Sequence, residues 1–409
     1  MNILMIGNGF DLAHGLPTKY TDFLDVVETF LSLIRNPQIL VSGGLNNTAK
    51  PKYQFLDRLI FQEESLCDEF NKMVQDNFWI NYFLCCESYE KENWIDFESE
   101  ISKVIQILDK EMLDSIGTKY QLSEKIMNLK NQHLAEWFNV PSMNENNEFD
   151  KVGKTISFKE IRDSLLNDLN RLIRALEIYL TDYAEKIEIK VKSPDIQSID
   201  VDVVLSFNYT NIYEKLYNSN KEIVYDYIHG FAELSHNLYN NNMVLGIDEY
   251  LPDDKKNKEV EFVGFKKFYQ RIYKETGCAY KEWVDQIRAD YEKHIQKKKQ
   301  AIKRSEIGLS DGIPALIDWV ATSNYLKIGC TMHYLYIFGH SLDVTDGDII
   351  RDLILNDNVY TIIFYLNKDV MGQQIANLVK VIGQDELIKR TGGVTKTIEF
   401  RQQKDMLVN

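Results

Sequence analysis

Short apolar runs, each followed by a polar or glycine-containing turn, recur along this chain of 409 residues. The first run covers residues 2–6 and ends at Gly7-Asn8-Gly9. A dense apolar run of this length is typical of a strand that is buried on both faces of a sheet. Similar runs predict further strands at residues 201–205, 223–228, 334–338 and 360–366, and alternation over residues 395–400 predicts an edge strand.

Helical periodicity dominates the segments between these runs. Thr18 is a suitable N-cap for a helix whose apolar face extends to Ile34. Ser157 and Glu160 form a capping box that opens a long helix, and residues 144–153 before it are predicted to form a loop. Residues 252–325 are also predicted to be helical and are rich in charged side chains.

Strands that are far apart in the sequence and separated by helices predict the α/β class, with a doubly wound, mostly parallel sheet and large helical insertions. We assign the core to residues 1–34, 198–250 and 328–409. The two helical insertions then cover residues 35–197 and 251–327, the second of them rich in charge.

The overall charge argues against two classes of partner. The chain has 47 basic and 62 acidic residues, a formal charge of −15, which disfavours broad binding to nucleic acid or to an anionic membrane. Five cysteines without a CxxC pair or a metal-ligand spacing fit a reducing cytosol and predict no metal site. Without an apolar run of roughly 18 residues or a signal-peptide pattern, we expect a cytoplasmic protein.

Candidate chemistry lies where the predicted strands end, because ligands of open α/β sheets bind at the carboxyl ends of the strands. Gly7 and Gly9 would let backbone N–H groups approach a phosphate closely. The dinucleotide pattern GxGxxG is incomplete, since Leu12 occupies the third glycine position. A tight strand-to-helix turn without a ligand explains these glycines equally well.

Two further strand ends carry groups suited to catalysis. Asn208 could hydrogen-bond a ribose hydroxyl or hold a water molecule, although an Asx turn is the simpler interpretation. His229, beside Gly230, could accept a proton near neutral pH, although a loop histidine is more often a capping or surface residue. Gly339-His340-Ser341 and Asn367 follow the next two predicted strands, so the signatures recur at successive strand ends.

Several of these segments together resemble the bacteriophage abortive-infection AbiH family. They are the opening motif from Gly7 to Thr18, Ser206-Phe207-Asn208-Tyr209-Thr210, Ile228-His229-Gly230 and Gly339-His340-Ser341-Leu342. The resemblance extends from residue 1 to about residue 370 and implies a role in antiviral defence and phage resistance. Residues 94–98 also resemble an AbiH signature, for which a helix start with Trp94 in the core is an equally good interpretation.

More distantly, the same order of motifs is similar to the sirtuins, which bind NAD and cleave its bond between nicotinamide and ribose. This resemblance implies a Rossmann-type core in which Asn208 and His229 are catalytic. It also implies that NAD, as substrate or ligand, is bound by Gly7, Asn8, Gly9, Phe10, Asp11, His14, Gly230, Gly339, His340, Ser341 and Asn367.

The chain departs from the sirtuin pattern at three points. Asp11 replaces the serine of the phosphate loop, Thr210 replaces the acid of T-x-N-x-D, and the four-cysteine zinc module is missing. The resemblance therefore favours the defence-type sirtuins, which destroy NAD, over protein deacylases. The implied activity is that of an NAD glycohydrolase, a hydrolase acting on N-glycosyl bonds.

Two other functions fit the same sequence. The protein could be a defence sensor or interaction module that binds a nucleotide without cleaving it. It could also act on nucleic acid through the basic stretch 294–304, although acidic neighbours dilute that charge and a solvated helix face explains it. A destructive enzyme must be gated, so a phage-derived or host trigger and a homo-oligomer are both compatible with the sequence.

Overall fold

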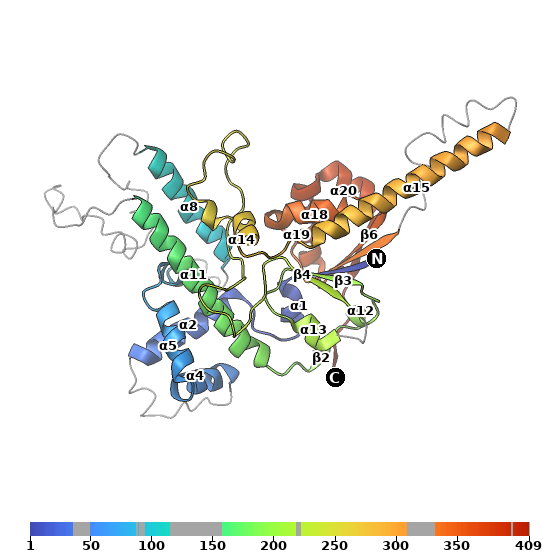
Figure 1. Ribbon diagram of the computed structural model, residues 1–409. Helices are drawn as coiled ribbons and strands as arrows, with labels where there is room; N and C mark the ends of the chain where they lie inside the picture. Colours follow the sequence, from blue (N-terminus) through green and yellow to red (C-terminus); the bar gives the residue numbers. More distant parts are fainter. Residues whose placement is uncertain are drawn as a thin grey trace. The chain divides into compact units, whose positions relative to one another are not determined.

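A computed structural model describes residues 1–35, 50–86, 89, 95–114, 158–217, 222–308, 332–393 and 396–408 (Figure 1). The chain divides into two compact units, and each is assembled from separate segments. Unit 1 contains residues 1–16, 189–230 and 276–409, and unit 2 contains residues 17–188 and 231–275. The domain boundaries expected from the sequence stay predictions, because a compact set of contacts is not by itself an independently folding domain.

Unit 1 is built on a parallel sheet of six strands in the order β4-β3-β1-β5-β6-β7. Every neighbouring pair of strands in this sheet is parallel. The α/β class and the doubly wound sheet are therefore confirmed, and β7 lies at an edge as its alternating pattern indicates. The strands are β1 (Asn2–Ile6), β3 (Val203–Ser206), β4 (Val224–Tyr227), β5 (His333–Phe338), β6 (Val359–Tyr365) and β7 (Ile398–Gln402).

The register of this sheet aligns the carboxyl ends of its central strands. Ile6 pairs with both Ser206 and Phe338, so the turns after β1, β3 and β5 begin side by side. Ser206 also pairs with Tyr227 of β4. The strand order reverses beside β1, because β3 and β4 lie on one side of it and β5 to β7 lie on the other. Such a reversal is the switch point at which doubly wound sheets bind ligands.

Helices cover both faces of the sheet, which explains why the strands read as continuous apolar runs. Alternate strand residues such as Ile3 and Leu335 share one core with α15 (Tyr280–Gly308), α18 (Gly347–Ile354), α19 (Lys368–Ile382) and α20 (Gln384–Thr391). On the other face, Phe10 of α1 (Asn8–Ala13) packs against Phe338. The remaining elements of unit 1 are α12 (Pro194–Gln197), α13 (Ile212–Tyr217), η3 (Val344–Asp346) and an antiparallel pair, β2 (Val191–Lys192) with β8 (Leu407–Val408), that the sequence pattern did not predict.

Unit 2 is helical, as the first insertion was expected to be. Its elements are α2 (Tyr20–Arg35), α4 (Pro51–Phe61), α5 (Glu64–Val74), α6 (Phe78–Leu84), α8 (Phe97–Asp114), α11 (Phe158–Asp182), η1 (Ala184–Lys186), η2 (Val263–Phe265) and α14 (Lys267–Tyr273). No helix in the described parts of either unit is long and apolar enough to cross a membrane.

The prediction of helix over residues 252–325 is wrong for residues 252–262. Residues 252–262 form turns, and regular helix begins only with α14. The reason is that Pro252 opens a stretch of charged side chains that has no apolar face to bury. Ser157 of the expected capping box, the loop 144–153 and residues 309–325 lie outside the described residues.

Residues 95–98, the described part of the motif at 94–98, lead into α8, which begins at Phe97. The Asp96 carboxylate accepts hydrogen bonds from the backbone N–H of Glu98 at 3.0 Å and of Ser99 at 3.3 Å. Phe97 is fully buried and stacks on Phe83 with ring centroids 4.1 Å apart. Capping and core packing thus account for the described part of this motif, whereas Trp94 lies outside the described residues.

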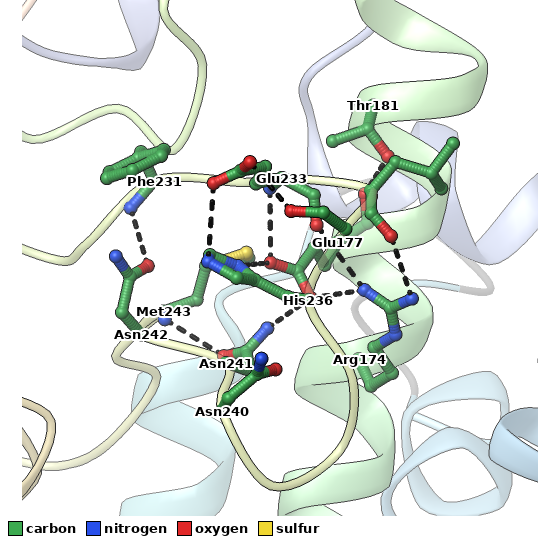
Figure 2. Close-up of polar contacts among 12 residues, drawn as sticks. Arg174, Glu177, Thr181, Phe231, Glu233, His236, Asn240, Asn241, Asn242 and Met243 are labelled. Carbon is green, nitrogen blue, oxygen red and sulfur yellow. Dashed lines mark hydrogen bonds and ion pairs between the residues drawn. The ribbon is translucent and has the colours of Figure 1, made fainter.

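A fully buried carboxylate, that of Glu177 on α11, holds the segment that follows β4 in the sequence (Figure 2). It accepts hydrogen bonds from the Arg174 guanidinium at 2.7 Å, the Glu233 backbone N–H at 3.1 Å and Nδ1 of His236 at 2.6 Å. The side-chain amide of Asn241 donates another. A buried charge is tolerated only when donors surround it in this way, so Glu177 fixes this segment to α11.

Two cations complete this network. Arg174, almost fully buried, also donates to the Glu69 carboxylate at 2.8 Å. The Lys274 ammonium donates to the Met243 carbonyl oxygen, and burial lowers the pKa of Lys274 to about 8, although Glu177 acts in the opposite direction. The network therefore centres on the buried pair Arg174 and Glu177, which partly exposed side chains surround.

We predict that Glu177→Ala lowers the free energy of unfolding by about 3–5 kcal/mol, because it leaves the buried Arg174 without one of its counter-charges. Urea denaturation followed by circular dichroism measures this loss. Glu28→Ala is the control, since Glu28 is exposed on α2 and its removal should cost no more than about 0.5 kcal/mol. Equal losses in the two variants would contradict the role given to Glu177.

Candidate functional site

The turn after β1 and the turn after β5 touch through their backbones. The Gly7 N–H donates to the Phe338 carbonyl oxygen at 3.2 Å, and the Gly9 N–H donates to that of Gly339 at 2.8 Å. Gly339 has a φ of +69°, and a Cβ atom there would lie 2.1 Å from the Phe10 nitrogen. A Cβ on Gly7 or Gly9 would lie within 3 Å of the Gly339 backbone. This mutual approach requires the three glycines, whatever the turns bind.

The contact changes the role expected for the glycine loop. The N–H groups of Gly7 and Gly9 are used between the turns, and the Phe10 N–H donates to the Gly7 carbonyl oxygen at 2.8 Å. These three donors are therefore engaged within the protein. Asn8, the first residue of α1, has an exposed side chain. That the loop binds a phosphate stays a prediction.

Asp11 is almost fully buried and is paired with two residues that follow β3. Its Oδ1 accepts a hydrogen bond from the Asn208 side-chain amide at 2.9 Å, and its Oδ2 accepts one from the Thr210 hydroxyl at 2.6 Å. The negative charge is thus directed to these donors. Since the amide of Asn208 donates to Asp11, its Oδ1 is directed elsewhere, and this buried atom has no hydrogen-bond partner among the described residues. It is an acceptor suited to a ligand or water.

Phe10 and His14 lie in the interior of unit 1. Phe10 is fully buried, with its ring centroid 4.3 Å from that of His14. Both ring nitrogens of His14 have protein partners, the Phe10 carbonyl oxygen and the Tyr217 hydroxyl, each at 2.7 Å. Burial lowers the pKa of His14, which favours a neutral ring that donates from Nδ1 and accepts at Nε2. These contacts give both residues a structural role, and contact with a ligand stays a prediction.

Asn208 and His229 lie at neighbouring strand ends, each two residues beyond the paired positions Ser206 and Tyr227. The ring of Phe207, the residue before Asn208, has its centroid 5.6 Å from that of His229 and 4.3 Å from that of His340. The strand ends of β3, β4 and β5 thus bring three of the expected site residues into one region of unit 1.

A carboxylate that the sequence interpretation missed lies between the two histidines. Oδ1 of Asp346 is 3.5 Å from Nε2 of His229, and its Oδ2 is 3.5 Å from Nε2 of His340. All three side chains are at least mostly buried. The sequence signal was weak, because Asp346 lies in a short 3₁₀ turn beyond the β5 motif. In the described parts of the chain, no group of three or more His, Cys, Asp or Glu residues is arranged to hold a metal ion.

The loop after β5 holds His340 in one orientation. The Leu342 backbone N–H donates to Nδ1 of His340 at 2.9 Å. Leu342 itself is fully buried and has a φ of +59°, a conformation that costs an L-residue about 1–2 kcal/mol. Such strain persists only where the surroundings impose it, and it is common at functional sites.

The remaining expected site residues have local structural roles. Gly230 forms a turn at φ +70°, with its N–H donating to the Tyr227 carbonyl oxygen at 3.0 Å. Asn367 is the N-cap of α19 and accepts from the Val370 N–H at 3.0 Å. Ser341 has an exposed side chain. Whether these residues also contact a nucleotide stays a prediction.

The fold and this region define a class: a doubly wound α/β protein with buried polar groups at the carboxyl ends of its central strands, the usual place for a ligand in such sheets. The family is shown by a direct comparison. Residues 3–365 match the model of the family described as Bacteriophage abortive infection AbiH, and the chain belongs to that family. The family places the protein in abortive-infection defence against phage. No curated protein and no solved structure matches the chain.

We predict that Gly339→Ala lowers the free energy of unfolding by about 2–5 kcal/mol, because the new methyl group meets the Phe10 backbone and the residue must keep a positive φ. Gly15→Ala is the matched control: Gly15 has a φ of +82°, but a Cβ there meets nothing within 4 Å. Its cost should be about 1–2 kcal/mol. Similar thermal or urea unfolding curves for the two variants would show that the turns do not touch.

Proposed function

We propose that this AbiH protein cleaves the bond between nicotinamide and ribose in NAD. The observation that carries the proposal is that Asn208 and His229 follow neighbouring strands, β3 and β4. The buried Oδ1 of Asn208 has no hydrogen-bond partner among the described residues. The strand order of the sheet, with its reversal beside β1, is the order of doubly wound dinucleotide-binding sheets. The sirtuin resemblance remains a prediction that supports the same reaction.

The residues fit the ribose end of such a substrate better than its pyrophosphate. Asn208 Oδ1 is a buried acceptor, which suits the hydroxyl of a ribose or an attacking water. The glycine turns give less support, since the N–H groups of Gly7, Gly9 and Phe10 already have backbone acceptors. In this proposal the protein positions the ribose and a water molecule, and exposed side chains such as Asn8 and Ser341 contact the rest of the nucleotide.

The chemistry needs few protein groups. Nicotinamide leaves NAD as a neutral molecule with the electron pair of the broken bond, so no general acid has to protonate it. The water oxygen forms the new bond to the ribose carbon, and one of its protons passes to His229. Products are nicotinamide, ADP-ribose and a proton. Positioning by Asn208 and proton transfer to His229 would supply most of the protein's contribution.

Asp11 supports this proposal because it orients Asn208 through a hydrogen bond. Its carboxylate is stabilised by hydrogen bonds from two neutral donors and holds the Asn208 amide in one orientation. Relative to the sirtuin pattern, hydroxyl and carboxylate have exchanged places between positions 11 and 210. The 2.6 Å hydrogen bond between them makes the two departures a compensating pair.

Asn208→Ala and His229→Ala should each lower the rate of nicotinamide release from NAD, by about 10²-fold or more for His229 as a general base. Both variants should stay folded, with a lower unfolding temperature for Asn208→Ala because the buried Asp11 carboxylate loses one of its donors. Chromatographic detection of free nicotinamide measures the rate, and His294→Ala, on the polar part of α15, is the control.

The same assay separates catalysis from sensing. Binding of NAD without release of nicotinamide by the parent protein would reject the glycohydrolase and favour the nucleotide sensor. Wild-type turnover in both site variants would reject the assignment of these two residues. The cytoplasmic location, the trigger and the oligomeric state stay predictions.

Asp11→Ala should lower kcat by about 10-fold or more, because alanine offers no acceptor to the Asn208 amide or to the Thr210 hydroxyl. Thr210→Val is the graded control, since it removes one hydrogen bond but leaves the carboxylate that orients Asn208. It should lower kcat less than Asp11→Ala. The reverse order would mean that Asp11 does not act through Asn208.

A further inference from the structure

The Asp346 carboxylate lies next to two imidazoles, those of His229 and His340, which points to a functional role for Asp346. A carboxylate only accepts hydrogen bonds, whereas a neutral imidazole has one donor and one acceptor nitrogen. Which nitrogen carries the proton is set by the partner of the other nitrogen. The contacts around Asp346 therefore bear on the protonation of His229, the proposed base.

The tautomer of His340 follows from its loop. The Leu342 N–H donates to Nδ1 at 2.9 Å, so that nitrogen holds a lone pair and the proton of the neutral ring is on Nε2. This Nε2 faces Oδ2 of Asp346 at 3.5 Å. Nδ1 of His340 thus accepts from the Leu342 N–H, and its Nε2 faces Asp346. His340 therefore orients Asp346 and does not act as a second base.

The other oxygen of Asp346 acts on His229 in the same way. Oδ1 lies 3.5 Å from Nε2 of His229, which favours the tautomer with the proton on Nε2. The lone pair is then on Nδ1, at the opposite side of the ring. Both separations are longer than an ordinary hydrogen bond, and such contacts commonly shorten once substrate is bound. Phe207, packed against both rings, limits their rotation.

Resting on the proposed function, we propose that Asp346, oriented by His340, is a positioning residue that makes Nδ1 of His229 the base in the cleavage of NAD. The water oxygen bonds to the ribose carbon as the bond to nicotinamide breaks, and the water proton moves to Nδ1. The imidazolium that results is then next to the Asp346 carboxylate, which stabilises its charge. Water and NAD supply all the atoms and electrons of this step, so no further reactant is needed.

Asp346→Asn tests the proposal with little change in shape. Its carboxamide can turn its NH₂ group towards Nε2 of His229 and so favour the wrong tautomer, with the proton on Nδ1. We expect kcat to fall by about 10²–10⁴-fold with KM little changed, as for a carboxylate that sets the tautomer of a catalytic histidine. Asp346→Glu, which keeps an acceptor, should recover part of the rate. Asp385→Asn, at an exposed site on α20, is the matched control.

Nitrogen NMR of the labelled imidazoles gives a second readout that does not depend on turnover. In the parent protein His229 should carry its proton on Nε2, and in Asp346→Asn it should carry it on Nδ1. Wild-type kcat in Asp346→Asn, or a parent His229 protonated on Nδ1 while neutral, would overturn the proposal. If the parent protein releases no nicotinamide, the proposed function fails, and the NMR result alone decides the positioning role.

Discussion

The contact between two backbone turns is the constraint on which the rest of unit 1 depends. The hydrogen bond from the Gly9 N–H to the Gly339 carbonyl oxygen, 2.8 Å long, joins the first turn of the sheet to a turn more than 300 residues later. Only residues without a side chain allow this approach. This contact fixes α1 relative to the loop that carries His340 and Asp346. Since Asp11 of α1 also accepts hydrogen bonds from Asn208 and Thr210, the same contact positions this loop relative to the end of β3.

The acidic side chains of the site show how a buried charge can be used for orientation. Asp11 directs the amide of Asn208, and Asp346 lies between His229 and His340. Asp11 has a hydrogen-bond donor on each of its oxygens, and each oxygen of Asp346 lies 3.5 Å from an imidazole nitrogen, so both carboxylates face polar partners. A negative charge near a proposed dinucleotide site is therefore not an obstacle when it is committed to protein donors.

In unit 2 a buried carboxylate surrounded by donors stabilises the fold. Glu177 gathers a guanidinium, an imidazole, an amide and a backbone N–H around one carboxylate. The residues it holds follow β4 in the sequence, directly after His229-Gly230. A charged network of this kind is sensitive to any change that removes one partner, because the remaining buried charges lose their compensation.

The sequence by itself determined the six strands of the parallel sheet, their α/β arrangement and the family, because buried parallel strands require unbroken apolar runs and the motifs lie directly after them. It also selected Asn208 and His229 by their positions at strand ends. Only the tertiary structure revealed that Gly7, Gly9 and Gly339 pack on one another, that Asp11 is paired with Thr210, and that Asp346 lies between two histidines. The error at residues 252–262 is different in kind, because the charged stretch after Pro252 has no apolar face and its sequence already favours turns. Local patterns report periodicity and turn chemistry, whereas contacts between distant residues are set by strand register and packing, which no local pattern contains.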